Sequence, residues 1–186
     1  MLPKPDFSTQ HAHIRLIAAT DATELLDYYR RNRTHLAAWE PSRLDDFYSQ
    51  ENMLTLILAA EGDFYAGKAI KLGAFAHTDG RLIASIDFSH IVRGPMQACY
   101  LGYSIDAQHQ GRGLMREFLP PCLQFIFHTL DLHRVQASYM IDNHRSGQLL
   151  AHLGFVQEGL AKQYLHINGQ WQDHILTAKI NPSDGV

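Results

Sequence analysis

The sequence predicts one α/β domain, residues 1–186, in which helices flank a mixed, mostly antiparallel central sheet. Two segments with helical periodicity come first, and a run of strand-like segments separated by turn residues follows. The chain then alternates strands and helices and ends in a hairpin, an order typical of α/β domains. The 186 residues suit a single domain, and a hydrophobic content of 46% is enough to build its core.

Two helices are expected in the first third of the chain, after a loose N-terminal arm and a strand at Ile14 to Ile17. In the first helix, Asp21 to Arg31, we expect Asp21 to cap the first turn and Glu24 to complete a capping box. The second helix is expected from Asp46 to Ala60. Its buried side is expected to carry Phe47, Met53, Leu54, Ile57 and Leu58.

The strands are predicted from aromatic and β-branched runs bounded by turn residues. Thr78-Asp79-Gly80 and Asn168-Gly169 are both typical of hairpin turns, because glycine accepts the positive φ that such turns need. The expected strands are Ala69 to His77, Arg81 to Ser89, Ala98 to Ile105, Gly159 to Ile167 and Gln170 to Ile180.

The second half of the chain is expected to contain two helices with a strand, His133 to Ile141, between them. The first helix runs from Gly113 to Leu130 and contains Pro120-Pro121, for which we expect a kink or break near Leu119. The second, His144 to Leu153, is expected to stop at Gly154.

Composition and charge disfavour several classes of protein. The formal net charge of -3 disfavours a nucleic-acid partner. No apolar run is long enough to span a bilayer and no signal peptide is apparent, so we expect a cytoplasmic protein without membrane contact. The 12 histidines do not cluster as a metal site, and Cys99 and Cys122 are expected to be free, buried thiols.

A glycine-rich turn follows the strand Ala98 to Ile105 and opens a helix at Gly111-Arg112-Gly113. Glycines allow close approach of a ligand, and the first N–H groups of a helix have no internal partner. Together they can bind a pyrophosphate, with Arg112 adding charge at its edge. The alternative is an ordinary strand-to-helix turn. The spacing fits neither a P-loop nor the dinucleotide-binding fingerprint.

Motifs along the chain carry a resemblance to a known family. Gln108-x-x-Gly111-x-Gly113 is similar to the acetyl-CoA motif of the GNAT superfamily of N-acetyltransferases, and a second family segment follows from Asn143 to Phe155. Trp39-Glu40-Pro41 and Asp173-His174-Ile175-Leu176 extend the resemblance to the RimJ/RimL-type branch, which acetylates ribosomal proteins. RimJ-type sequences look nearest, over Ile14 to Ile180.

The resemblance implies a GNAT fold whose sheet splays between two strands, with acetyl-CoA in the gap. It implies that one strand presents its backbone to the acetyl and pantetheine groups, that the turn holds the pyrophosphate, and that the facing helix also contacts the cofactor. The implied cofactor-binding residues are Tyr100, Leu101, Gly102, Tyr103, Ser104, Ile105, Gln108, His109, Gln110, Gly111, Arg112, Gly113, Leu114, Asn143 and Ser146. Asn143 is also a favoured helix N-cap.

The resemblance also implies two catalytic residues. Many relatives carry a tyrosine acid seven positions after the asparagine, but this chain has Leu150 there. The RimJ/RimL branch implies Ser146 as the donor to the CoA thiolate and Glu158 as a base acting through water. The alternatives are a serine that bonds only backbone and a solvated loop glutamate. Direct attack in a ternary complex is expected, with Cys99 as the alternative nucleophile of a ping-pong route.

The acceptor is expected to be the N-terminal alanine of a ribosomal protein, small-subunit protein five by resemblance. Alternatives are a small amine, amino acid or antibiotic as acceptor, or an acetyl-CoA-binding ribosome assembly module with little catalysis. A monomer or homodimer is expected. Four residues are expected to bind the acceptor: Trp39, Glu40, Tyr139 and Tyr164. Each aromatic residue among them has a core position as its alternative.

Overall fold

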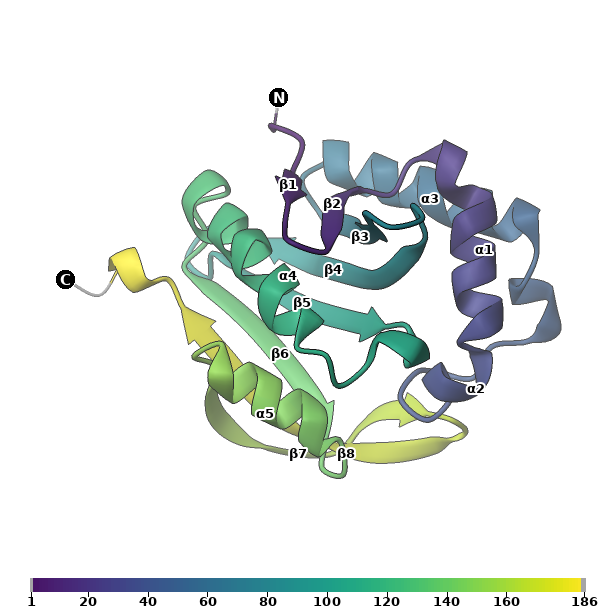
Figure 1. The fold of residues 1–186 in the computed structure, drawn as a ribbon. Coiled ribbons are helices and arrows are strands. Elements are labelled where there is room, and N and C mark those ends of the chain that lie inside the picture. The colour runs from purple at the N-terminus through teal and green to yellow at the C-terminus, as the bar shows by residue number, and fades with distance from the viewer. Residues whose placement is uncertain (1, 185–186) are drawn as a thin grey trace.

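Eight strands form one sheet in the order β1-β2-β3-β4-β5-β6-β8-β7 in the computed structural model, which describes residues 2–184 (Figure 1). The strands are β1 (Asp6–Ser8), β2 (Ala12–Leu16), β3 (Ile70–Ala76), β4 (Leu82–Val92), β5 (Ala98–Ile105), β6 (Arg134–Met140), β7 (Val156–Ile167) and β8 (Gln170–Ile180). The helices are α1 (Ala22–Arg31), α2 (Arg33–Leu36), α3 (Gln50–Tyr65), α4 (Leu114–Gln124) and α5 (His144–His152).

One strand pair, β5 with β6, is parallel, and the other neighbours are antiparallel. The parallel pairing covers only Ala98–Tyr100 of β5 and Arg134–Gln136 of β6. Beyond it, β5 stays paired with β4 and β6 stays paired with β8, but the two strands no longer pair with each other. The sheet is therefore splayed between β5 and β6, which confirms the predicted fold class.

Helices cover both faces of the sheet. The helices α4 and α5 lie over one face, in front of the strands in Figure 1, while α1 and α3 pack on the other side. Apolar residues of α4 such as Phe118 and Leu119 are fully buried in the larger core cluster. A second cluster joins Leu25 and Tyr28 of α1 to Phe75 and Leu82 of the sheet.

The first residues are not a loose arm, as the sequence suggested. Residues Asp6–Ser8 pair with residues 13–15 of β2, and Phe7 packs edge-on against Phe125 at 6.0 Å between ring centroids. The prediction was wrong because a three-residue strand has too few positions to display an alternating pattern.

The capping box predicted for α1 is also wrong. Asp21 does precede the helix, but its side chain caps nothing there. The carboxylate instead accepts hydrogen bonds from Arg15 Nη1 at 2.7 Å and from the Ala18 backbone N–H at 2.8 Å. Glu24 accepts from the Leu82 backbone N–H at 3.0 Å. Both carboxylates thus tie α1 to its surroundings, a tertiary use that sequence spacing does not reveal.

The second helix begins later than predicted and is buried on a different side. Ser49 caps it by accepting from the Asn52 N–H, so α3 starts at Gln50 and continues to Tyr65. Met53 and Ile57 are buried as expected, whereas Leu54 and Leu58 are 39% and 52% exposed. The buried stripe of α3 consists of Met53, Ile57 and Phe64, which are spaced four and seven residues apart, because the packing of α3 on the protein turns Leu54 and Leu58 toward solvent.

The helix α4 continues through Pro120 and Pro121, so the break expected near Leu119 is absent. Each proline lacks an N–H donor and its ring crowds the carbonyl four residues earlier, but the buried side chains around them, including Phe118 and Cys122, pack the helix into the larger core cluster. The departure from α geometry comes later, as a π-helical turn at Phe125–Thr129 in which Leu130 N–H donates to the Phe125 carbonyl.

No helix within residues 2–184 combines the length and the apolar character that crossing a bilayer requires.

Candidate active site

The turn between β5 and α4 presents a row of free backbone donors. Gly111 and Gly113 have φ of 72° and 76°, a conformation that favours glycine, and Gly113 directly precedes the first residue of α4. Among the described residues, the backbone N–H groups of residues 111–115 donate to no protein acceptor. A Cβ added at either glycine would meet nothing within 4 Å, so the turn is open on its outer side. This geometry suits a diphosphate.

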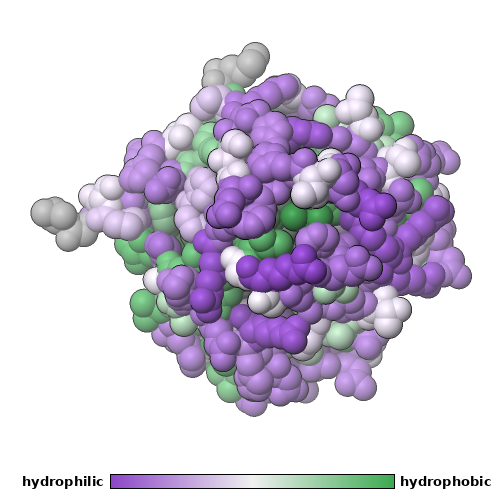
Figure 2. Space-filling view, viewed as in Figure 1, coloured by the Kyte–Doolittle hydropathy of each residue, from purple (hydrophilic) through white to green (hydrophobic). Residues whose placement is uncertain are grey.

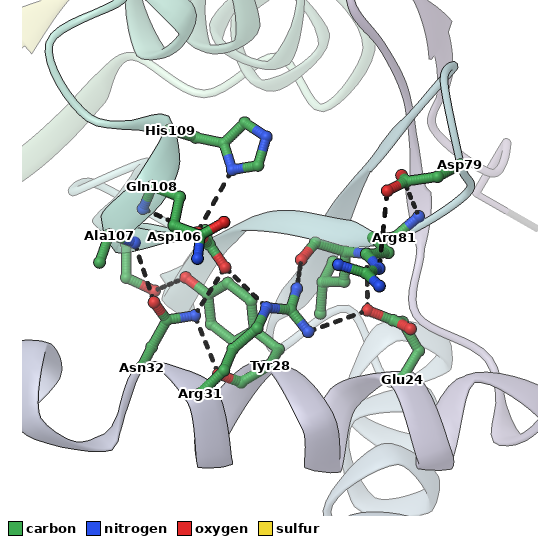
Figure 3. A network of polar contacts seen from close by, with 12 residues as sticks. Glu24, Tyr28, Arg31, Asn32, Asp79, Arg81, Asp106, Ala107, Gln108 and His109 are labelled. Atoms are coloured by element: carbon green, nitrogen blue, oxygen red, sulfur yellow. Dashed lines mark hydrogen bonds and ion pairs between the residues drawn. The ribbon is translucent and has the colours of Figure 1, made fainter.

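The turn is anchored by Asp106, a carboxylate that is 3% exposed and lies at the end of β5 (Figure 3). It accepts hydrogen bonds from Arg31 Nε at 2.6 Å, Asn32 Nδ2 at 3.1 Å and the Gln108 backbone N–H at 2.9 Å. The Asn32 side-chain oxygen accepts from the Ala107 N–H at 2.8 Å. The C-terminal end of α1 therefore fixes the start of the turn.

The charge state of Asp106 follows from these bonds. Burial alone would raise the pKa of its carboxyl, but hydrogen bonds from Arg31, Asn32, the Gln108 backbone and His109 outweigh burial and lower the pKa to about 2. Asp106 is thus an anion at neutral pH that holds its donors in place.

Gln110 joins the turn to helices on both sides. Its amide nitrogen lies 2.7 Å from His35 Nε2 on α2, and its oxygen accepts from Arg145 Nη1 of α5 at 2.6 Å. His35 and Arg145 were not predicted as site residues from the sequence, although Arg145 follows Asn143 by only two residues. Arg145 and the exposed Arg112 bring two cations to the turn.

The first turn of α5 holds Asn143 and Ser146. The Asn143 side-chain oxygen accepts from the Ser146 backbone N–H at 3.2 Å, so Asn143 is the N-cap of α5. The Ser146 hydroxyl lies 2.6 Å from the Tyr103 hydroxyl of β5. Burial raises the pKa of Tyr103 to about 12, although the hydrogen bond with Ser146 opposes the shift. Leu150, at the position where relatives carry a tyrosine, is buried in the core.

The gap between β5 and β6 begins at the pair Tyr100 and Gln136. Among the described residues, the side-chain nitrogen of Gln136 is buried and has no hydrogen-bond partner. Buried polar groups are almost always bonded, so an acceptor group supplied by a ligand would satisfy this nitrogen. Sequence reasoning missed Gln136, since only the strand pairing places it at the start of the gap. In the space-filling view of this face, hydrophobic surface near the centre is surrounded by hydrophilic residues (Figure 2).

The structure does not bring Glu158 into contact with Ser146. Glu158 is exposed, sits at a β-bulge of β7 and forms an ion pair with Arg134. Arg134 is the first residue of β6 and pairs with Ala98, whereas Ser146 contacts Tyr103, five residues further along β5. Five residues of strand span about 17 Å. The role of Glu158 as a base therefore stays a prediction.

The four residues predicted to bind the acceptor differ in their surroundings. Glu40 forms an ion pair with Arg43 at 2.6 Å beside a cavity of about 170 Å³ that Asn168 of the β7–β8 turn also lines, and its neighbour Trp39 is 38% exposed. Tyr164 lies beside His174, with ring centroids 5.6 Å apart. Tyr139 packs against Gly147 of α5, where an added Cβ would come within 2.8 Å of its ring.

Both cysteines are free and buried, as predicted. Burial raises the pKa of each thiol to about 12. A thiolate at Cys99 is therefore rare at neutral pH, which disfavours a covalent acetyl-cysteine route.

Known proteins resemble this chain in both sequence and fold. The acetyltransferase (GNAT) domain family matches residues 12–156. The ribosomal protein uS5-alanine N-acetyltransferase of Escherichia coli is 43% identical over 182 residues, covering 97% of this chain and 93% of that protein. The crystal structure of a ribosomal-protein-S5-alanine acetyltransferase from Vibrio fischeri is 39% identical, with a TM-score of 0.92, over 96% of this chain and 97% of the other.

A third relative supports the fold alone. The Mycobacterium smegmatis RimJ structure in complex with CoA-disulfide has a TM-score of 0.89 at 23% identity, over 98% of this chain and 89% of that one. The family match covers well over half of the chain, and it agrees with the splayed sheet and the glycine turn described above. The chain belongs to the GNAT family of acetyltransferases.

Proposed function

We propose that this protein transfers the acetyl group of acetyl-CoA to the N-terminal α-amine of an alanine, that of ribosomal protein uS5, in the cytoplasm. The observation that carries the acceptor is the similarity to uS5-alanine N-acetyltransferases, which spans almost the full length of both chains. The net charge of -3 favours a basic protein tail over nucleic acid as the partner.

The glycine turn supports acetyl-CoA as the donor. Five successive N–H groups have no acceptor in the described part of the chain. These groups, the nearby cations Arg112 and Arg145 and the open space outside Gly111 all suit a diphosphate. Within residues 2–184, residues 101–105 of β5 have β4 on one side and no strand on the other, so their backbone can bond an extended amide chain such as pantetheine.

The proposed chemistry is direct attack by the acceptor amine within a ternary complex. An N-terminal α-amine has a pKa of about 7.7–8.0, so part of it is already neutral near pH 7 and no strong base is needed. Solvent water takes the amine's proton, because Glu158, the predicted base, is paired with Arg134 about 17 Å along the sheet from the contact between Ser146 and Tyr103. Backbone N–H groups of β5 stabilise the oxyanion, and Ser146 donates to the sulfur as it leaves.

Peptide acetylation with defined N-termini tests this proposal. The purified protein is given acetyl-CoA and peptides that differ only in an N-terminal Ala, Ser or Met, with an N-acetylated Ala peptide as the blocked control and spermidine as a small amine. We expect thiol release, with a mass gain of one acetyl group, chiefly for the free Ala peptide. Preference for spermidine would identify a small amine as the acceptor in place of a protein N-terminus. Tight acetyl-CoA binding without thiol release in the presence of any of these amines would indicate a binding module.

A further inference from the structure

The hydroxyls of Tyr103 and Ser146 meet across the open end of the sheet. Tyr103 lies on the unpaired part of β5 and Ser146 in the first turn of α5, and their oxygens are 2.6 Å apart. The contact joins two segments 43 residues apart in the sequence. It is the side-chain hydrogen bond that connects the strand predicted to hold the acetyl group with the residue predicted to donate to sulfur.

Several contacts fix both partners. The Asn143 side chain holds the Ser146 backbone, and Gly147 leaves room for the Tyr139 ring beside the same turn of α5. Tyr103 packs against the larger core cluster. A serine hydroxyl has one hydrogen and two acceptor positions, so the direction of the Tyr103–Ser146 bond decides where the serine's hydrogen points. Tyr103 has a pKa of about 12, so its phenol remains protonated at neutral pH and available as the donor.

We propose that Tyr103 is a positioning residue for Ser146: its phenol O–H donates to Ser146 Oγ, which leaves the serine's own hydrogen free to donate to the departing sulfur. The inference rests on the proposed role of Ser146 and adds a residue that acts through it. Donation from Tyr103 also polarises the serine hydroxyl, because linked hydrogen bonds strengthen one another.

The step balances without a proton leaving either hydroxyl. The amine nitrogen forms the new C–N bond, the C–S bond breaks, and its electron pair stays on sulfur. The amine's proton passes to the base or to water. Ser146 and Tyr103 stabilise the negative charge on sulfur through two hydrogen bonds in series.

The variant Tyr103→Phe tests the proposal, with Tyr28→Phe as the matched control. Tyr28 of α1 is fully buried and its hydroxyl bonds Ser104 of β5 at 2.9 Å, so each variant loses a part-buried tyrosine–serine hydrogen bond that involves β5. We expect Tyr103→Phe to lower kcat about tenfold, the scale of a hydrogen bond to a developing charge, and to leave the KM for acetyl-CoA unchanged. Tyr28→Phe should keep kcat within about twofold.

A double-mutant cycle with Ser146→Ala decides whether Tyr103 acts through the serine. We expect Tyr103→Phe to cause no further loss of kcat once Ser146 is alanine. An additive loss, or wild-type kcat in Tyr103→Phe, overturns the proposal. A lower KM for acetyl-CoA at unchanged kcat in Tyr103→Phe also overturns the proposal, because the Tyr103–Ser146 bond would then hinder cofactor binding and contribute nothing to the chemical step. The assay uses whichever amine the wild-type enzyme acetylates, so a wrong acceptor assignment does not affect it. If Ser146→Ala turns over at the wild-type rate, Ser146 is not the donor to sulfur and Tyr103 is not its positioning residue.

A fluorinated tyrosine at position 103 gives a second measurement that keeps the ring shape, should Tyr103→Phe prove unstable. Its phenol ionises at lower pH than that of tyrosine and then no longer donates. We expect kcat to fall at a lower pH than in the natural enzyme, and an unchanged pH profile of kcat argues against the proposal.

Discussion

Asp106 is a single buried carboxylate on which the geometry of the glycine turn depends. It collects donors from the last turn of α1 and from the turn itself, and the hydrogen-bonded Arg31 guanidinium supplies the charge that burial requires. Such a group links stability to pH. Its pKa of about 2 lies below the usual value of 3.8, so the folded protein holds the ionised form more tightly than the unfolded chain does.

We predict that Asp106 contributes about 2 kcal/mol to the free energy of unfolding above pH 4, and that this contribution is lost as the pH falls from about 4 to about 2. The sign follows because the unfolded chain binds the proton first. Urea unfolding of the wild type and of Asp106→Asn at a series of pH values measures it. The variant should be the less stable at pH 7, and the difference should narrow by about 2 kcal/mol near pH 2. If the free energies of unfolding of the wild type and of Asp106→Asn changed in parallel with pH, the assigned charge state of Asp106 would be wrong.

Individual site residues differed in how far the sequence predicted them. The helix-capping role of Asn143 is local, since donor and acceptor are three residues apart, and the structure has it as expected. The partner of Ser146 was missed, because Tyr103 reaches it from another element. Tyr103 was predicted only as part of the strand that holds the cofactor. Contacts between distant segments leave no periodic signal in one sequence.

At the scale of elements, the glycine turn shows what local sequence determines. A helix that starts at two glycines with positive φ leaves its first N–H groups without partners inside the helix. For the same reason the hairpin at Asn168-Gly169, with φ of 47° and 79°, was predicted correctly. The strand β1 was not predicted, because its three residues form a strand only by pairing with residues 13–15 of β2. The start of α3 was misplaced although its cap is local, with Ser49 accepting from the Asn52 N–H three residues later.

We predict that Gly111→Glu weakens acetyl-CoA binding at least tenfold, through backbone strain of about 1 kcal/mol and through repulsion between the carboxylate and the diphosphate. Gly80→Glu is the matched control, since Gly80 has φ of 73° and equally open surroundings but lies in the β3–β4 hairpin. Titration calorimetry with acetyl-CoA compares the two. Gly111→Ala separates strain from charge and should lose less affinity than Gly111→Glu. Equal affinity of both glutamate variants would remove the turn from the binding site.

At the scale of the whole molecule, the splay between β5 and β6 links the fold to the chemistry. The turn and β5 lie on one side of the gap, and β6 and the first turn of α5 on the other. The sequence predicted the elements and, through resemblance, the splay. It did not predict that β8 lies between β6 and β7, because strand order depends on long-range pairing. The same limit explains why Glu158 and Ser146 were placed in one mechanism without a known distance between them.

An open gap of this kind favours both substrates meeting at once, and we predict a sequential mechanism with no acetyl-enzyme. Cys99 lies on the part of β5 that is still paired with β6 and is fully buried, and its raised pKa of about 12 keeps it a thiol. Initial rates with both substrates varied should give intersecting double-reciprocal lines, and intact mass after acetyl-CoA alone should show no added acetyl group. Cys99→Ala should keep kcat within about threefold, because only a small packing loss is expected. Parallel lines together with a stable 99-acetylated species would instead establish the ping-pong route.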